Sequence, residues 1–251
     1  MSKVYFIGAG PGDVELITVK GKRLLEAADV VIYAGSLVNP ELVLNIKAQV
    51  YDSASMVLEE IMTLMEAAIK DNKTVIRLHT GDTAFYSAIS EQIEVLRERG
   101  IDYEVVPGVS SAQACAAVLG QEFTIPEVSQ TIIFTRLEGK TPVPERESLR
   151  ELSQHGATMA IFLSVGMVER VRAELLEGYK EETPVAVIER VTWPNERVIR
   201  CRLGDLVEAV QSAGIQKTAI ILVGEALWAS LQNTDRKSKL YSKDFSHGYR
   251  K

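Results

Sequence analysis

The chain has 251 residues, of which 46% are hydrophobic and 25% are charged, and its formal net charge at pH 7 is −6. A chain of this length and composition buries one large core or two moderate ones, which excludes an intrinsically disordered protein. The negative charge disfavours binding that depends on neutralising many phosphates, so nucleic acid is not an expected partner. No apolar run approaches the ~18 residues of a membrane span, and no long signal core precedes the first strand. We therefore expect a cytoplasmic protein.

Cysteine and histidine are too sparse to form a recognisable metal site. Cys115 and Cys201 lie far apart, and His79, His155 and His247 share no metal-ligand spacing with them or with one another. We expect both cysteines to be buried thiols and expect no protein-bound metal.

Short β-branched runs predict four strands in the first half of the chain, at residues 4–7, 30–33, 74–78 and 103–106. Helical spacing of apolar residues separates them, for example at Leu24, Leu25 and Ala28. This alternation is typical of a parallel α/β sheet.

The pattern changes after about residue 120, where strands are predicted at 131–135, 158–163, 184–189, 197–202 and 219–223. The segment T192-W-P-N-E196 joins two of them without room for a helix, which indicates an antiparallel pair. We predict an α/β fold with two α/β domains: a parallel-sheet domain at 1–114, a mixed-sheet domain at 115–231, and a polar tail at 232–251.

The opening stretch V4-Y-F-I-G-A-G-P-G-D13 places a glycine-rich turn after the first predicted strand. A dinucleotide site requires G-x-G-x-x-G and an acidic residue at the end of the second strand. Here Gly8, Gly10 and Gly12 give G-x-G-x-G, and Pro11 removes a backbone N–H from the turn. Dinucleotide binding is therefore disfavoured. The turn either needs glycine for its backbone conformation or contributes to the site of another ligand.

Two more loops of small residues, H79-T-G-D-T83 and P107-G-V-S-S111, follow predicted strands and precede helical patterns. The carboxyl ends of parallel strands meet at one edge of a sheet, where ligands bind. The helix after the first of these loops is expected to carry Phe85 on an apolar face with Ile89, Ile93 and Leu96. Asp82 is either the N-cap of that helix or a ligand-binding carboxylate.

The segment from V4 to G21, the T80-G-D82 loop and P107-G-V-S-S111 together resemble the tetrapyrrole methylase family, over residues 3 to about 225. The resemblance implies binding of S-adenosylmethionine, an active site in a cleft between two α/β domains, and a homodimer. Within the family, A34-G-S-L-V-N-P40, E127-V-S-Q-T131, the stretch from T135 to E145 and T192-W-P-N-E196 resemble members that methylate C11 of precorrin-4, with or without cobalt, in cobalamin biosynthesis.

The family's cofactor site, carried over by motif, implies contacts from Pro11, Thr80, Gly81, Asp82, Phe85, Ser110, Ser111, Leu163, Val191 and Ala219. A tetrapyrrole substrate carries several carboxylate arms, and the planar guanidinium of arginine suits carboxylates. The expected substrate-binding residues are Arg136, Arg190, Trp193 and Arg197. The alternatives are surface arginines paired with Glu189 and Glu196, and a tryptophan that closes a hydrophobic corner.

No catalytic residue is assigned from the sequence. Family members that act on the earlier, fully reduced macrocycle carry an aspartate just after the second strand, where this chain has Ala34 and Gly35. Methyl transfer from a sulfonium requires positioning rather than a metal or a nucleophile, so the motifs do not exclude a non-catalytic tetrapyrrole or nucleotide-binding module. A relative that methylates another ring position, RNA or a protein side chain is the alternative within the enzyme class.

Overall fold

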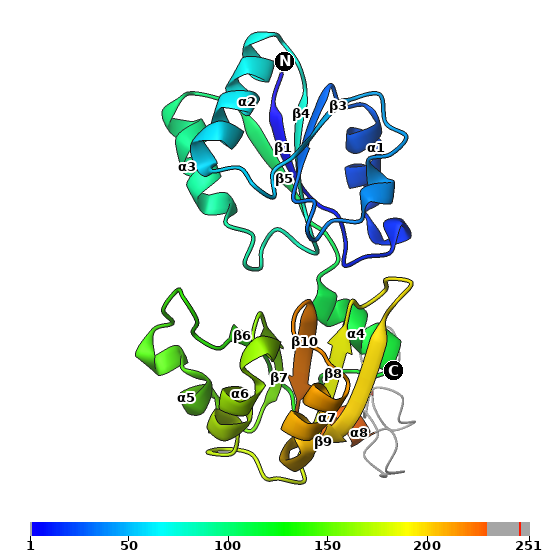
Figure 1. The fold of residues 1–251 in the computed structure, drawn as a ribbon, viewed down its shortest axis with the longest axis vertical. Helices are drawn as coiled ribbons and strands as arrows, with labels where there is room; N and C mark the ends of the chain where they lie inside the picture. Colours follow the sequence, from blue (N-terminus) through cyan, green and yellow to red (C-terminus); the bar gives the residue numbers. More distant parts are fainter. Residues whose placement is uncertain (1, 230–245, 247–251) are drawn as a thin grey trace. The chain divides into compact units, whose positions relative to one another are not determined.

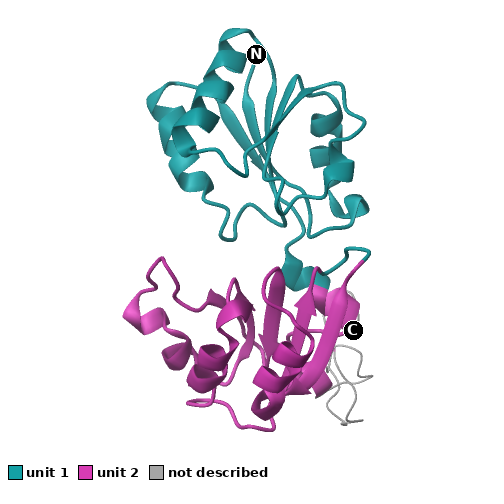
Figure 2. Cartoon of the chain, in the orientation of Figure 1, with its two compact units in different colours: residues 1–114, 191–194 teal, residues 115–190, 195–251 magenta. Residues whose placement is uncertain are grey.

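The computed structural model describes residues 2–229 and residue 246. Two compact units divide the chain: unit 1 holds residues 1–114 and 191–194, and unit 2 holds residues 115–190 and 195–251 (Figure 2). The predicted tail at 232–251, with His247 and Tyr249, lies outside the described residues except for Ser246.

Unit 1 is built on a parallel five-stranded sheet with the strand order β3-β2-β4-β1-β5 (Figure 1). Its strands are β1 Val4–Gly8, β2 Val30–Tyr33, β3 Gln49–Asp52, β4 Val75–His79 and β5 Tyr103–Val106. Its helices are α1 Val19–Glu26, α2 Leu58–Lys70 and α3 Ile89–Glu98, and α4 Ser111–Leu119 carries the chain into unit 2. The central strands are buried because helices cover both faces, as expected for a parallel sheet.

Successive residues along the strands of unit 1 point to opposite faces of the sheet and so contribute to two separate cores. Ile7 and Leu78 pack with Leu25 on the face covered by α1, whereas Phe6 and Met65 belong to the core under α2 and α3 (Figure 1). This period-two division follows from strand geometry. The loops that leave the carboxyl ends of β1, β4 and β5 are therefore anchored by strands that are packed from both sides.

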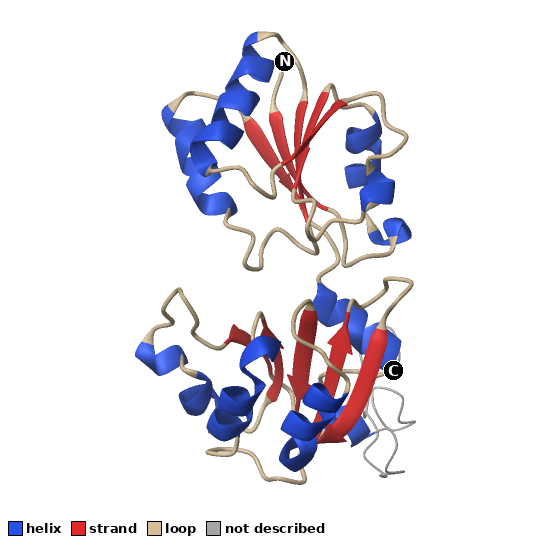
Figure 3. Cartoon of the chain, in the orientation of Figure 1, coloured by secondary structure: helices blue, strands red, loops and turns tan. Residues whose placement is uncertain are grey.

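Unit 2 contains a mixed sheet with the order β6-β7-β10-β8-β9, in which β6 and β7 are parallel and the other pairs are antiparallel. Its strands are β6 Ile132–Arg136, β7 Thr158–Phe162, β8 Pro184–Glu189, β9 Arg197–Arg202 and β10 Ala219–Val223. Its helices are α5 Leu149–Ser153, α6 Val168–Leu175, α7 Leu206–Ser212 and α8 Ala226–Ala229 (Figure 3). Leu149, Val171 and Leu206 pack from three of these helices onto one core with Ile161 of β7.

The predicted fold class is confirmed: a parallel sheet precedes a mixed sheet, and the turn at 192–196 joins the antiparallel strands β8 and β9. The strand β3 was not predicted, because the sequence Q-V-Y-D is polar and its residues lie exposed or half-buried at the sheet edge. Cys115 is fully buried as expected, but Cys201 is only half-buried. Within residues 2–229, no helix is both long enough and apolar enough to cross a bilayer.

The helix expected directly after the 79–83 loop begins later than its apolar pattern indicates. Tyr86 and Ala88 have φ angles of 54° and 50°, which interrupt any helix through them, so α3 starts at Ile89. Phe85 lies in the loop and not on the helix. The expected apolar face therefore loses its first member, and Asp82 does not cap α3, since Ala88 occupies the N-cap position.

Candidate functional site

Three loops meet at the carboxyl edge of the sheet in unit 1. The register places Gly8 of β1 opposite His79 of β4, and Ile7 opposite Val106 of β5, so these three strands end level with one another. Beyond the strands, Gly10 and Gly81 exchange two backbone hydrogen bonds, with N–H to O distances of 3.2 and 2.7 Å. The opening turn is thus tied by its backbone to the T80-G-D82 loop, as the sequence led us to expect of loops at one sheet edge.

Close backbone contact accounts for the opening glycine. A Cβ atom on Gly8 would lie 2.6 Å from both the Cα of Gly108 and the carbonyl oxygen of Gly81, and such contacts are not tolerated. The three loops therefore pack backbone against backbone. By contrast, a Cβ on Gly81 would meet no atom closer than 3.9 Å, although its φ of +63° favours glycine. Gly81 is therefore required by its backbone conformation and not by close packing.

The Asp82 carboxylate joins two of these loops. Its Oδ1 accepts a hydrogen bond from the backbone N–H of Ala84 and its Oδ2 accepts one from the N–H of Gly108, both at 2.7 Å. The sequence offered a helix cap or a direct ligand contact for Asp82; the cap of α3 is Ala88, and the structure shows a role that was not expected. Asp82 holds the 107–111 loop against its own loop through charge-assisted hydrogen bonds.

His79 is buried beneath this edge and its Nε2 has no hydrogen-bond partner among the described residues. Burial, with a smaller contribution from the positive charge of Arg77, lowers the pKa of His79 to about 3. Arg77 is itself buried, and burial lowers its pKa to about 10. It donates to Gln92 Oε1, Ser53 Oγ and the carbonyl of Ile32 at 3.0 to 3.3 Å. The imidazole therefore stays neutral at physiological pH.

Residues 191–194 belong to unit 1, where they pack on the opening turn. The Trp193 indole N–H donates to the Pro11 carbonyl at 3.0 Å, and a Cβ on Gly12 would lie 2.5 Å from that indole nitrogen. The Asp13 N–H donates to Thr192 Oγ1 at 3.0 Å. Trp193, expected either on the macrocycle or in a hydrophobic corner, here covers the opening turn.

The loops offer small and mostly uncharged side chains to a ligand such as S-adenosylmethionine. Ser110 is buried, and Thr80 and Phe85, which lie on either side of Gly81 in the chain, are half-buried. Ser110 Oγ accepts the N–H of Ala112 at the start of α4. In unit 1 these are the residues that would hold the cofactor. Val191, also expected at the cofactor, is buried, and Ser111 opens α4.

Unit 2 gathers its own expected residues at one edge of its sheet. Arg136 ends β6 opposite Phe162 of β7, and Ala219 begins β10 opposite Glu189 of β8. Since β10 runs antiparallel to both β7 and β8, the start of β10 lies beside the ends of those strands. Leu163 follows β7, so it shares this edge.

Non-glycine residues with left-handed backbone cluster at this edge. Leu163, Arg190 and Thr218 have φ angles of 54°, 48° and 56°, and the Arg190 N–H donates to the Thr218 carbonyl at 2.9 Å. Such conformations cost about 1 to 3 kcal/mol each and persist where the surroundings impose them, often at functional sites. The Leu163 side chain is nevertheless 69% exposed. An exposed, strained leucine is therefore a feature that burial alone does not explain.

Arg136 donates to three backbone carbonyls of the loop that follows it: Leu137 at 3.4 Å, Thr141 at 3.2 Å and Pro142 at 2.9 Å. All of these acceptors are neutral. Within the described chain no carboxylate pairs with this guanidinium, so its positive charge is not compensated at the sheet edge.

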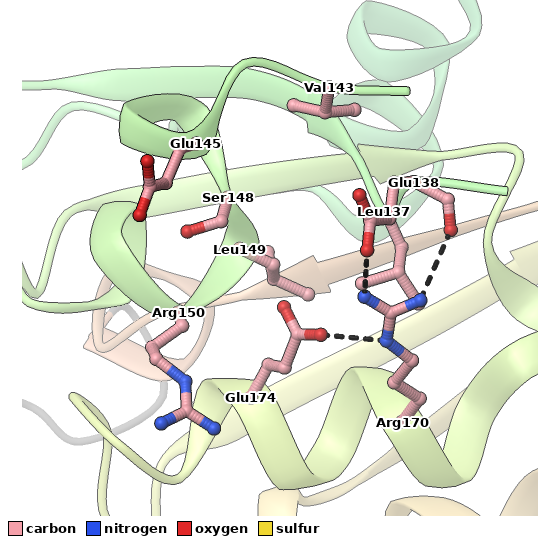
Figure 4. Close-up of a pocket in the computed structure, with 9 residues that line it drawn as sticks. All are labelled: Leu137, Glu138, Val143, Glu145, Ser148, Leu149, Arg150, Arg170 and Glu174. Carbon is pink, nitrogen blue, oxygen red and sulfur yellow. Dashed lines mark hydrogen bonds and ion pairs between the residues drawn. The ribbon is translucent and has the colours of Figure 1, made fainter. Parts of the chain in front are cut away.

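Arg170 of α6 contacts the same loop at Glu138. It donates to the carboxylates of Glu138 at 2.6 Å and Glu174 at 2.8 Å, and to the Glu138 carbonyl (Figure 4). A cavity of about 290 Å³ lies here, lined by Leu137, Glu138, Val143, Glu145, Ser148, Leu149, Arg150, Arg170 and Glu174. Its charged groups are largely paired with one another, which favours a structural role.

The two arginines expected near the tryptophan turn differ from Arg136. Arg197 donates to the Glu189 carboxylate and to the Ala213 carbonyl, both at 2.6 Å, as in the surface-pair alternative. Arg190 donates to Asn195 Oδ1 at 3.4 Å, a long hydrogen bond. Arg197 is thus paired with a carboxylate, whereas Arg136 donates to backbone carbonyls alone.

Comparison with known proteins places this geometry in a family. The sequence profile of the tetrapyrrole (corrin/porphyrin) methylases matches residues 3–207. The chain belongs to this family. The cobalt-precorrin-4 C(11)-methyltransferase of Methanocaldococcus jannaschii is 54% identical over 99% of this chain and 96% of that protein. The precorrin-4 C(11)-methyltransferase of Pseudomonas aeruginosa is 48% identical over 98% of both chains.

Solved structures of the family have the same fold. The X-ray structure of the cobalt-precorrin-4 methyltransferase CbiF matches with a TM-score of 0.88 at 49% identity, covering 90% of this chain and 95% of that one. The uroporphyrin-III C-methyltransferase of Thermus thermophilus, complexed with S-adenosylhomocysteine, matches with a TM-score of 0.77 at 28% identity, covering 90% and 99%. The chain is therefore a methyltransferase by family and fold.

Sequence reasoning did not single out three polar residues that organise the two edges. Ser164 Oγ accepts the N–H of Leu137 at 2.8 Å and so ties the end of β6 to that of β7. Arg77 gave a signal, since a charged residue inside an apolar run predicts a buried polar contact. Asp52 gave none, because the strand that it ends was not predicted.

Proposed function

We propose that this protein transfers the methyl group of S-adenosylmethionine to C11 of precorrin-4 or of cobalt-precorrin-4 in cobalamin biosynthesis. The observation that carries the proposal is the identity of 54% and 48%, over nearly the full chain, to relatives that carry these two names. Because the two relatives differ in whether the named substrate contains cobalt, both forms are proposed.

S-adenosylmethionine supplies an activated methyl group on a positively charged sulfur. Pro11, Thr80, Gly81, Phe85 and Ser110, with Ser111, Val191, Leu163 and Ala219, are the residues proposed to hold it. Asp82 acts through the loops that it joins. The rate gain comes from holding the methyl group and the ring carbon in line at about 3.5 Å with water excluded.

The macrocycle is an anion that needs fixed positive charge. Arg136 is proposed as its main carboxylate ligand, because its guanidinium is held by neutral carbonyls and keeps donors for a planar carboxylate. Arg190 and Trp193 are proposed near the same substrate. Arg197 is the weakest of the four expected residues, since Glu189 already neutralises it. The homodimer and the cytoplasmic location are proposed from the family resemblance alone.

The test is direct. The protein is incubated with S-adenosylmethionine labelled with ¹³C in the methyl group and with precorrin-4 or its cobalt complex, and the product is examined by carbon NMR. We expect the label on C11. A label on another ring carbon or on a side-chain oxygen contradicts the assignment, and tetrapyrrole binding without any transfer of label indicates a non-catalytic binding module.

A further inference from the structure

The carboxylate that the sequence lacks after β2 is present one strand further along the sheet. Asp52 ends β3, and the register places it opposite Tyr33, the last residue of β2. All five strands are parallel, so Asp52 lies at the same edge of unit 1 as the ends of β1 and β4. Its side chain is exposed.

Gly35 and Asp52 are fitted to each other. The N–H groups of Gly35 and Ala54 both donate to Asp52 Oδ1, at 3.0 and 2.9 Å. A Cβ atom on Gly35 would lie nearest to Oδ2 of this carboxylate, and 2.5 Å from its carbon and 2.6 Å from Oδ1. Any side chain at position 35 would therefore displace the carboxylate, so the glycine leaves the space that Asp52 fills.

The two oxygens of Asp52 differ in what they contact. Oδ1 takes both backbone hydrogen bonds, while no described residue donates to Oδ2. The carboxylate is thus held in one orientation, with Oδ2 beside Gly35 and without a hydrogen-bond donor among the described residues. Two other groups at this edge are less suited to accept a proton, since both oxygens of Asp82 accept backbone N–H bonds and the pKa of His79 is about 3.

The proposed reaction requires a proton acceptor. When the C–C bond to the methyl group forms and the S–C bond breaks, the sulfur leaves neutral and the positive charge passes to the macrocycle. In the metal-free macrocycle, that charge lies on a ring nitrogen conjugated with the attacked double bond, as an iminium N–H, and loss of this proton restores neutrality. Resting on the proposed function, we propose that Asp52 Oδ2 faces the macrocycle and accepts this ring proton.

The first experiment compares Asp52→Asn with Asp29→Asn. The amide oxygen of the first variant still accepts from Gly35 and Ala54, but its nitrogen cannot accept a proton. Asp29 is the matched control: it is also exposed and accepts one backbone N–H, from Thr74 at 2.8 Å, but at the amino end of the strands. We expect kcat of Asp52→Asn to fall about 10²- to 10⁴-fold, as for loss of a proton-transfer group. The calorimetric affinity of Asp52→Asn for S-adenosylhomocysteine and the kcat of Asp29→Asn should not change.

The second experiment separates proton transfer from loop support. Asp52→Ala leaves an exposed gap beside Gly35, and formate added in solution should restore much of its lost kcat. A structural role predicts no rescue. Wild-type kcat in Asp52→Asn, or a folded Asp52→Ala that formate does not rescue, overturns this inference and leaves the proposed function standing. A wild-type protein that transfers no methyl group overturns the proposed function, and this inference with it.

Discussion

Two polar side chains at the carboxyl edge of unit 1 have distinct roles. Asp82 accepts N–H bonds from two different loops, whereas His79 is buried and kept neutral. The bonds of Asp82 form without a bound ligand. They fix the shape of the edge in advance, which lowers the cost of ordering the site when a ligand binds.

Loss of the Asp82 carboxylate should therefore weaken cofactor binding more than folding. In Asp82→Ala the N–H groups of Ala84 and Gly108 lose their acceptor, and the 107–111 loop is no longer held. We expect the affinity for S-adenosylhomocysteine to fall by about 1.5 to 3 kcal/mol, the range for hydrogen bonds to a charged group. Titration calorimetry gives the affinity and thermal unfolding gives the stability.

Asp29→Ala is the control for this loss, because it also removes a carboxylate that accepts a backbone N–H, from Thr74, away from the loops. It should melt somewhat earlier and bind normally. An Asp82→Ala protein with unchanged affinity and a lower melting temperature would show that this carboxylate serves folding alone.

His79 makes the stability of the protein depend on pH. Its pKa is about 3 in the folded state and near 6.5 when unfolded, so between these values only the unfolded chain binds the proton. The free energy of unfolding therefore falls as the pH is lowered from 6.5 toward 3, with a slope that approaches about 1.4 kcal/mol per pH unit. Urea unfolding at pH 7, 6, 5 and 4 measures it.

The variant His79→Gln should lose this part of the slope, while His155→Gln should keep it, since His155 is exposed. Carboxylates also titrate in this range, so the comparison is the difference between the variants and the wild type. If His79→Gln and the wild type show the same dependence on pH, His79 has the same pKa in the folded and the unfolded protein, which contradicts this prediction.

At the scale of elements, the strand ends of unit 2 decide which arginine is suited to bind an anion. Arg136 leaves β6 into a loop of carbonyl acceptors, whereas Arg197 begins β9 directly opposite Glu189. The register thus pairs the Arg197 guanidinium with a carboxylate and leaves the charge of Arg136 unpaired in the part of the chain that the structure describes. Similar residues in similar positions acquire different chemistry because of their cross-strand neighbours.

Arg136→Gln should accordingly weaken tetrapyrrole binding by about 1.5 to 3 kcal/mol, as expected for a lost hydrogen bond to a carboxylate. Cofactor affinity should stay nearly intact. Arg197→Gln is the matched change and should have a much smaller effect, since exposed ion pairs contribute little. Fluorescence titration with the tetrapyrrole measures both. A larger loss in Arg197→Gln than in Arg136→Gln would reverse the assignment.

The strands were predictable where apolar β-branched residues dictate them, and β2, β5, β8, β9 and β10 have the predicted bounds. The polar edge strand β3 could not be found this way, because it does not fill a core. The start of α3 was missed because left-handed residues at 86 and 88 interrupt a pattern whose spacing is helical. Apolar sequence patterns indicate which residues are buried, but burial decides neither the position of β3 nor the start of α3.

At the scale of the whole molecule, the family and the loops of the candidate site followed from short motifs, because small residues at close backbone contacts leave a readable pattern. The contacts of particular side chains did not follow. From the sequence, Asp82 is equally compatible with a helix cap, a ligand contact or a link between loops. Each of these roles requires a short side chain with a hydrogen-bond acceptor at this position. Asp52 contributes through a residue 17 positions away, and single-sequence patterns do not report such pairs.

The grouping of residues 191–194 with unit 1 has a consequence for synthesis of the chain. Residues 1–114 leave the ribosome long before Trp193 is synthesised. The opening turn therefore emerges without the indole that packs against Gly12 in the folded protein. The Pro11 carbonyl also lacks the hydrogen bond from the Trp193 indole N–H until most of unit 2 has been translated. The nascent first unit can assemble its sheet early, but its glycine turn matures only near the end of translation.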